Sequence, residues 1–330
     1  MYIAYAVVLL LIVGGIHALR QYLFNVSQAP KNHEPFAGKL FEAGEATIAY
    51  RPAAVKAHAT VVAMPGFLED HRYFTGLYSD PDVELVLINS CNYHPPVIPN
   101  NRESCGFFNN YGFDLGSIEY DAAVLNWAVE NLVTTNKMRL HGHSRGGAVV
   151  LEALKQNPSL HRESEVVLEA PVLPQGKGYP ALEAAFGTIG LYLLPLIVPL
   201  IKRIPAGLYL PILYRPMNER KKTLLPGLFY NPKNYRTIVE NIHSLEQWME
   251  QNDFSIYQNV KNGVILIAEK DTVLDRKSML ASAHKAGDGV SVIETKNTSH
   301  FVSLDDPAVV PLISKSNDIK GSPKSVVFSR

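Results

Sequence analysis

Short runs of apolar, often β-branched residues alternate with helical segments along most of the chain, and this alternation constrains the fold most strongly. The runs "ATVVAM", "VELVLIN", "KMRL", "VVLE" and "VILIA" contain few polar residues. Strands that are apolar on both faces are typical of a parallel sheet covered by helices on both sides. Residues 118–133 and 146–156 have the apolar spacing of such helices. We therefore expect an α/β fold with a mostly parallel sheet flanked by helices.

The start of the chain has a different composition. Residues Tyr2 to Leu19 contain no Lys, Arg, Asp or Glu, and an apolar run of about 20 residues can span a bilayer. A signal peptide usually carries Lys or Arg before its apolar stretch, and this chain has neither there. We favour an uncleaved membrane anchor over a cleaved signal segment, which would make the protein secreted, and over a buried core helix. Arg20 and Lys31 follow the run and favour the cytoplasmic side for the main domain.

The remaining chain divides by pattern into a core and an insertion. We expect an anchor over residues 1–20, a linker over 21–35, a core formed by 36–173 and 254–330, and a helical cap or lid over 174–253. The insertion shows no clear strand pattern and includes "IGLYLLPLIVPLI", which is too short and too rich in proline for a second span. The basic cluster from Lys202 to Lys222 is typical of a solvated face, with anionic headgroups as the alternative partner.

Composition excludes several classes of function. Lys plus Arg and Asp plus Glu both number 31, so the formal net charge is zero, whereas nucleic-acid binding needs a basic excess. Cys91 and Cys105 are the only cysteines, too few for a zinc ribbon or a disulfide framework, and we expect free thiols. We expect neither a cofactor nor a metal.

Candidate functional residues follow the predicted strands directly. Ligands of open α/β sheets bind outside the carboxyl ends of the strands. Gly66, Ser144, Glu169, Asp271 and His300 each stand just after a predicted strand. The sequence therefore predicts a serine, two acids, a histidine and a glycine turn at one edge of the sheet.

Ser144 is the centre of the pentapeptide Gly142-His143-Ser144-Arg145-Gly146, a G-x-S-x-G pattern between a predicted strand and a predicted helix. A turn from strand directly into helix holds the serine in a strained conformation with its hydroxyl exposed. A Cβ at Gly142 or Gly146 would collide with the neighbouring elements. The context therefore predicts that Ser144 is a nucleophile.

The order Ser144, Asp271, His300 resembles the α/β-hydrolase superfamily, over about residues 37–320. "AEKDTVLD" is similar to the acid loop of that family, and "NTSHFVSLDDP" is similar to its histidine loop. The resemblance implies a cofactor-free hydrolase with an acyl-enzyme intermediate. In that chemistry Ser144 attacks a carbonyl carbon, His300 transfers the proton, and Asp271 fixes the imidazole tautomer. Ser144 also argues against the branches of the family that carry Asp at this position.

Backbone N–H groups of Phe67 and Arg145 are the expected oxyanion donors, and one such donor is often worth about 3 kcal/mol. The family often has histidine where this chain has Pro65, so Leu68 is an alternative to Phe67. The Arg145 side chain either binds a carboxylate or phosphate, or lies along the surface.

Several assignments have alternatives. Asp275 and Glu169 are rivals of Asp271 as the acid. His141 and His143 flank the serine turn, and we expect both to pack or to hydrogen-bond there rather than to act as the base.

Three hypotheses follow for the function. The first is a membrane-anchored serine hydrolase that cleaves a lipid-like or other apolar carboxylic ester. The second keeps the same three residues in an acyltransferase, a thioesterase or a C–C hydrolase. The third is a non-catalytic, membrane-tethered binding protein that retains the fold.

Overall fold

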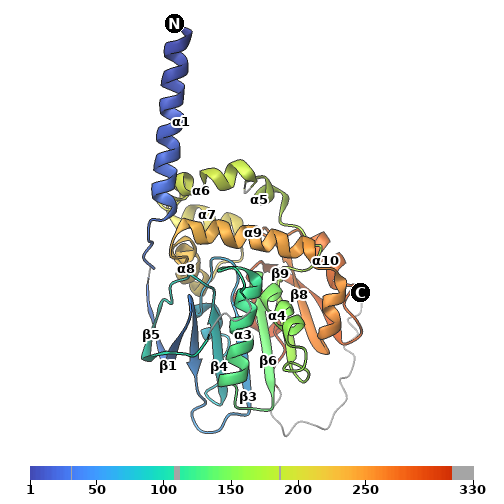
Figure 1. The fold of residues 1–330 in the computed structure, drawn as a ribbon. Coiled ribbons are helices and arrows are strands. Elements are labelled where there is room, and N and C mark those ends of the chain that lie inside the picture. Colours follow the sequence, from blue (N-terminus) through green and yellow to red (C-terminus); the bar gives the residue numbers. More distant parts are fainter. Residues whose placement is uncertain (31, 108–111, 186, 314–330) are drawn as a thin grey trace.

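The computed structural model describes residues 1–30, 32–107, 112–185 and 187–313. A nine-stranded sheet forms its centre, in the order β5-β1-β2-β4-β3-β6-β7-β8-β9 (Figure 1). β2 runs antiparallel to β1 and β4, and every other neighbouring pair is parallel. This confirms the expected mostly parallel sheet. The strands are β1 (Glu34–Ala43), β2 (Ala46–Arg51), β3 (Ala59–Met64), β4 (Val83–Asn89), β5 (Val97–Ser104), β6 (Met138–His143), β7 (Glu165–Glu169), β8 (Asn262–Lys270) and β9 (Val290–Ser299).

Helices cover both faces of the sheet and its carboxyl edge (Figure 1). The α-helices are α1 (Tyr2–Phe24), α2 (Arg72–Thr75), α3 (Ile118–Leu132), α4 (Arg145–Gln156), α5 (Pro180–Ala185), α6 (Thr188–Ile201), α7 (Ala206–Leu213), α8 (Glu219–Leu224), α9 (Tyr235–Gln251), α10 (Arg276–Ala283) and α11 (Val302–Asp305). Short 3₁₀ helices are η1 (Leu225–Tyr230), η2 (Phe254–Asn259) and η3 (Pro307–Val309).

Alternate residues of the central strands pack on opposite faces, which explains why these runs are apolar throughout. In β3, Val62 and Met64 join a core with α3 and α4. Val61 and Ala63 join a second core with α2 and Phe301. Both faces of the sheet are therefore buried at its centre, as is typical of parallel strands.

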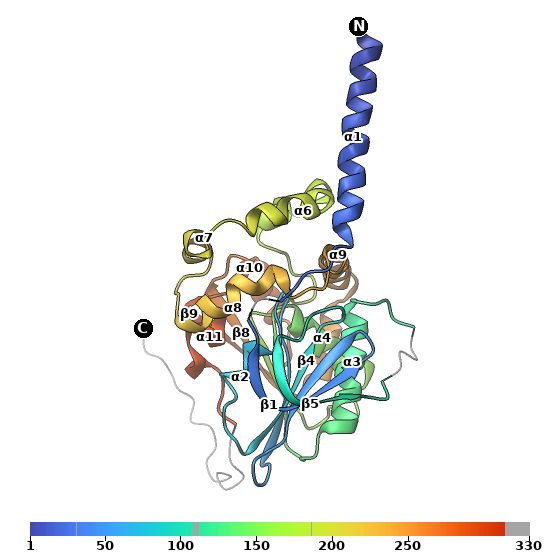
Figure 2. The same ribbon diagram turned by 90° about the vertical axis from the view of Figure 1, so that its left-hand side faces the viewer.

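The residues 174–253 lie over the carboxyl edge as helices α5 to α9 with η1, and the described part of this segment contains no strand. In Figure 2 these helices lie on the side of the sheet from which α1 projects, with α6 beside the lower part of α1. The prediction of a solvated basic face is wrong for Lys221. Its side chain is fully buried, where it pairs with Asp305 and donates a hydrogen bond to Ser299 Oγ at 2.8 Å.

α1 projects from the body of the protein as a rod (Figure 1). None of its residues is buried, and among the described residues it is the one helix long and apolar enough to cross a membrane. The helix continues to Phe24, and β1 begins at Glu34, so the extended linker is shorter than the predicted residues 21–35. Lys31 of the predicted linker lies outside the described residues. Residues 314–330, which belong to the predicted core, lie outside them as well.

Candidate active site

Ser144 lies on a turn between β6 and α4. Its backbone has φ 51° and ψ −120°, a region that a residue other than glycine occupies only under strain. A Cβ on Gly142 would lie 2.4 Å from the Gly146 carbonyl oxygen, and one on Gly146 would lie 2.0 Å from the Met64 carbonyl oxygen. The glycines of the pentapeptide are therefore required by the close passage of strand and helix.

Backbone hydrogen bonds hold this strained turn. The Ser144 N–H donates to the Glu169 carbonyl oxygen at 2.9 Å. The Ser144 carbonyl oxygen accepts from the N–H groups of Gly147 and Val172, both at 2.9 Å. These bonds join the serine turn to the end of β7 and to the loop that follows it.

Asp271 and His300 follow β8 and β9 and meet at the same edge. His300 Nδ1 lies 2.8 Å from Asp271 Oδ2, and both side chains are buried. Asp271 Oδ1 accepts from the backbone N–H groups of Val273 at 2.8 Å and Leu274 at 2.9 Å. Burial opposes ionisation of Asp271, but the charge and hydrogen bond of His300 and these two N–H groups outweigh it and lower the pKa of the carboxyl.

His143 connects the histidine loop to the serine turn, and the sequence did not predict this connection. Its Nε2 lies 2.9 Å from the His300 carbonyl oxygen, and its Nδ1 lies 2.8 Å from Glu69 Oε2. Glu69 Oε2 also accepts from the Gly66 N–H at 2.8 Å. Tyr73 stacks on the His143 ring, with 4.3 Å between centroids. One residue beside Ser144 thus fixes the backbone of His300 and the glycine turn after β3.

The two partners of His143 favour its protonated form. A carbonyl oxygen only accepts hydrogen bonds, so Nε2 carries a proton, and the Glu69 carboxylate accepts a second hydrogen bond from Nδ1–H. Burial disfavours the charged ring, but the charge and hydrogen bond of Glu69 outweigh it and raise the pKa of His143 to about 9. Two features of the sequence could have predicted this pair: Glu69 stands three residues after Gly66, and His143 stands directly before Ser144.

The glycine turn after β3 packs directly against Ser144. A Cβ on Gly66 would lie 2.8 Å from Ser144 Cβ. Leu68 has φ 66°, and its N–H donates to the Tyr93 hydroxyl at 3.1 Å. Among the described residues no acceptor is bonded to the N–H of Phe67 or of Arg145. Of the two predicted donors after β3, the Phe67 N–H is thus the one left without an acceptor among the described residues, and the Arg145 N–H stands at the first position of α4.

Both predicted placements of the Arg145 side chain are wrong. The side chain is fully buried beneath the serine turn and makes no contact with solvent. It donates to Asp121 Oδ2 at 2.6 Å, to the Gly116 carbonyl oxygen at 2.9 Å and to Ser90 Oγ at 3.2 Å. Asp121 is also fully buried. Arg145 therefore joins the serine turn to α3 and does not bind substrate through its guanidinium.

The rival acids have other partners. Glu169 accepts hydrogen bonds from the Tyr73 hydroxyl and the Ser303 N–H, both at 2.6 Å, and its carboxylate lies 3.1 Å from His141 Nε2. Burial opposes its ionisation, but the hydrogen bond and charge of His141, the charge of His143 and the Ser303 N–H lower the pKa of Glu169 to about 2. Asp275 caps α10 by accepting from the Ser278 N–H at 2.8 Å.

The helices over the carboxyl edge close the site. Ser144 is 4 % exposed and His300 is 3 % exposed. Phe67 and Leu68 pack in one apolar cluster with α6 and α9, whose members are Leu191, Leu194, Val198, Tyr235, Ile238 and Ile242. On the histidine side, the buried Leu210 of α7 lies in the same core as Phe301. Ser144 and His300 are therefore covered by protein on the side of these helices.

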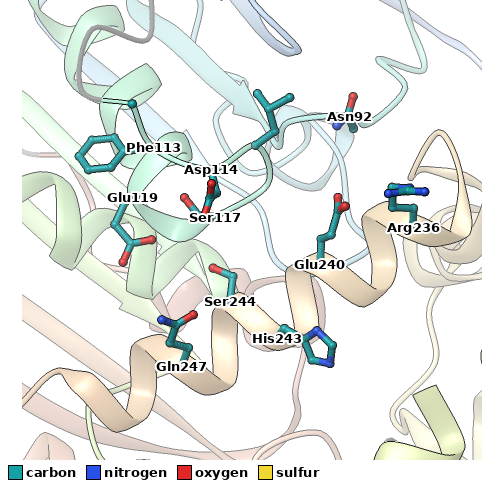
Figure 3. A pocket seen from close by; sticks show the side chains of 12 residues that line it. Asn92, Phe113, Asp114, Ser117, Glu119, Arg236, Glu240, His243, Ser244 and Gln247 are labelled. Carbon is teal, nitrogen blue, oxygen red and sulfur yellow. The ribbon is translucent and has the colours of Figure 1, made fainter. Parts of the chain in front are cut away.

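A large groove lies elsewhere, between α9 and the loop before α3. Its volume is about 770 Å³, and Ser144, Asp271 and His300 do not line it. Figure 3 shows Glu240 and Ser244 of α9 facing the loop that carries Asp114 and Ser117. Among the described residues, no group of three His, Cys, Asp or Glu side chains is arranged to hold a metal ion.

The comparisons with known proteins agree with this architecture. The sequence model of the alpha/beta hydrolase family matches residues 61–310. Among curated proteins, none matches this sequence.

Solved structures match over most of the chain at low identity. An alpha/beta hydrolase fold protein from Chitinophaga pinensis is 12% identical, with a TM-score of 0.56, and the alignment covers 83% of this chain and 94% of that one. A bromoperoxidase from Bacillus anthracis is 13% identical, with a TM-score of 0.56 and coverage of 79% and 91%. A protein from Burkholderia cenocepacia assigned as an aryl esterase is 13% identical, with a TM-score of 0.57 and coverage of 82% and 93%. At this identity the likeness concerns the fold.

Proposed function

Because this chain belongs to the alpha/beta hydrolase family, we propose that it is a serine hydrolase that cleaves a carboxylic ester through an acyl-enzyme. One observation carries the proposal. The buried His300–Asp271 pair, 2.8 Å apart, is tied through the His300 carbonyl oxygen to His143, the residue before the strained Ser144. This arrangement supports Ser144 as the nucleophile, His300 as the base and Asp271 as the acid that orients it, because the backbone of His300 is held by the neighbour of Ser144.

Each group has a role in the proposed reaction. Asp271 accepts from the Nδ1–H of His300, which leaves Nε2 free to take the Ser144 hydroxyl proton. Ser144 Oγ then forms a bond to the ester carbonyl carbon, and the N–H groups of Phe67 and Arg145 stabilise the oxyanion. The C–O bond to the alcohol breaks as His300 returns the proton to the leaving oxygen.

The second half of the reaction repeats these steps with water. His300 takes a proton from a water molecule whose oxygen attacks the acyl carbon. The bond to Ser144 Oγ breaks, and the proton returns to Ser144. The products are the acid and the alcohol, and the balance needs no cofactor or metal.

The charges around Ser144 support an apolar substrate. The side chains of His143, Arg145 and Glu169 are all paired with other protein groups, so none is left to bind a charged substrate. The helices over the site present Leu, Ile, Val and Tyr side chains instead. We infer an acyl ester with an apolar chain, such as a lipid, and α1 as the anchor that holds the site beside a bilayer.

Hydrolysis of p-nitrophenyl esters by the full chain in mild detergent tests the proposal. We expect Ser144→Ala to abolish turnover and labelling by a fluorophosphonate probe. Ser159→Ala, at an exposed serine, is the matched control and should retain both. Equal rates for wild type and Ser144→Ala would refute the proposal.

Two further readouts separate the remaining functions. Product analysis with added alcohols or amines separates a hydrolase from an acyltransferase, and thioester and C–C substrates test the other reactions of the same three residues. Folded protein that fails to react with the probe indicates a non-catalytic binding protein. A rate that is flat from C2 to C12 acyl chains argues against the apolar substrate.

A further inference from the structure

Helices α6 and α7 are apolar on the side that faces away from the protein. The segment 184–218 contains no Asp or Glu, and neither helix contains a charged residue. Leu208 is 66 % exposed and Ile212 is 76 % exposed, and the other large apolar side chains exposed here are Ile189, Tyr192, Ile197, Leu200, Ile204 and Leu213. Soluble proteins rarely expose so continuous an apolar surface to water.

The inner sides of the same helices are also apolar. Leu191, Leu194 and Val198 of α6 pack with Phe67 and Leu68, beside Ser144. Leu210 of α7 shares a core with Phe301, the residue after His300. A helix that is apolar all round lies in a core or in lipid. Because one side of each helix already covers the active site, the other side needs an apolar partner from outside the chain.

The position of α1 identifies that partner. Tyr192 of α6 accepts a hydrogen bond from Arg20 at its carbonyl oxygen, at 2.8 Å, and its hydroxyl lies 2.8 Å from His17 Nδ1. The uncharged part of α1, Tyr2 to Leu19, has eighteen residues and a length of about 27 Å. The hydrocarbon core of a bilayer is about 30 Å thick. α6 is therefore attached to α1 at the level where the anchor leaves the lipid.

The arrangement of the two helices fits this level. Figure 2 shows α6 and α7 at the end of the protein from which α1 projects. Exposed Arg203 stands three residues before α7, and exposed Arg215 stands two residues after it. Cations beside an apolar helix are typical of segments that lie in the interface of an anionic membrane.

We propose that the outer surface of α6 and α7 is a second membrane contact, which lies in the interface of the bilayer that α1 anchors. The inference rests on the proposed anchor and ester hydrolase. It adds that substrate passes from the same bilayer between α6 and α7 to Ser144. These two helices pack against the glycine turn after β3 and against Phe301 of the histidine loop. The substrate class is then an acyl ester dissolved in the membrane.

Fluorescent probes at single cysteines test the contact directly. The full chain with Cys105→Ser, which removes the partly exposed thiol and leaves Cys91 buried, is labelled with NBD at Leu208→Cys or Ile212→Cys. The control is Val55→Cys, which is 91 % exposed in the β2–β3 loop, at the opposite edge of the sheet. Each is reconstituted into phosphatidylcholine vesicles with a minor share of phosphatidylglycerol.

We expect doxyl-labelled lipid to quench the probes at 208 and 212, and iodide in water to quench the probe at 55. Probes at 208 and 212 that respond like the probe at 55 would overturn the membrane contact. This readout needs no activity, so it holds even if ester hydrolysis is not found.

The route of the substrate has its own test. We compare the rate on an ester embedded in vesicles with the rate on a short soluble ester, for wild type and for Leu208→Glu with Ile212→Glu. The ratio of the two rates should fall about tenfold or more, because a carboxylate is disfavoured in lipid. An unchanged ratio with intact ester hydrolysis would leave the proposed function standing and refute this inference.

Discussion

The ion pair between His143 and Glu69 makes the stability of this protein depend on pH in a defined window. His143 stands directly before Ser144, and both of its ring nitrogens have acceptors. The pKa of His143 rises from its ordinary 6.5 to about 9 in the folded chain, because the charge and hydrogen bond of Glu69 outweigh the cost of burial. Folding therefore strengthens proton binding at this residue.

The sign and size of the effect follow from linkage. A histidine whose pKa is raised by folding contributes its full stabilisation below the unfolded pKa, and the contribution is lost as pH rises through the folded pKa. One pKa unit corresponds to about 1.36 kcal/mol, so the raised pKa of His143 contributes about 3 kcal/mol to the free energy of unfolding, with Glu69 as the main stabilising partner. This contribution is present below pH 6.5 and disappears as pH rises through about 9.

Urea unfolding of the full chain in mild detergent measures this change, with the fluorescence of the two tryptophans, Trp127 and the buried Trp248, as the signal. The comparison is between wild type and Glu69→Gln, which keeps the shape of the side chain and removes its charge. Other groups that titrate in this range are present in both proteins and cancel. The stability advantage of wild type should shrink by about 3 kcal/mol across the window.

Glu45→Gln is the matched control, because Glu45 forms an ion pair with Lys233 in which both side chains are largely exposed. It should leave the pH profile of wild type unchanged. Parallel pH profiles for wild type and Glu69→Gln would refute the assignment of a protonated His143. A profile with the opposite slope would refute it as well.

Two further variants test other parts of the site. Asp121→Asn should lower the free energy of unfolding by about 3–5 kcal/mol, because it leaves the buried Arg145 charge without its partner. Urea unfolding measures this, and a loss below about 1 kcal/mol contradicts the buried pair. Asp271→Asn should lower kcat about 10³- to 10⁴-fold, because an amide favours the wrong tautomer of His300. Ester hydrolysis measures it, and a loss under tenfold reassigns the acid.

The central sheet could be predicted from the sequence because its strands are buried on both faces. β3 and β4 read as continuous apolar runs, and both are fully buried. β5 was not predicted, because it pairs with β1 alone at the edge of the sheet and most of its residues are exposed or half-buried. An edge strand needs no apolar pattern, so "VIPNNRES" carried no signal.

The candidate site was only partly predictable. The glycines around Ser144 mark the serine turn in the sequence, because a strand that turns directly into a helix leaves no room for a Cβ at Gly142 or Gly146. No pattern in the neighbouring sequence predicts the partners of the charged residues beside Ser144. Arg145 bonds to a residue 24 positions earlier, and His143 bonds to a residue 74 positions earlier. Burial of a charge depends on its partner, and only the folded chain brings these partners together.

The two charged neighbours of Ser144, His143 and Arg145, connect the serine turn to different parts of the protein. His143 ties the serine turn to the histidine loop and to the turn after β3, whereas Arg145 ties it to α3. Both charges are paired with carboxylates inside the protein, so neither can bind a charged group of a substrate. Substitutions at Arg145 should therefore change stability and kcat while the preference for acyl-chain length stays constant. That preference should instead respond to the size of Leu194 in α6 and Ile238 in α9, which pack in one cluster with Phe67 and Leu68 of the glycine turn after β3.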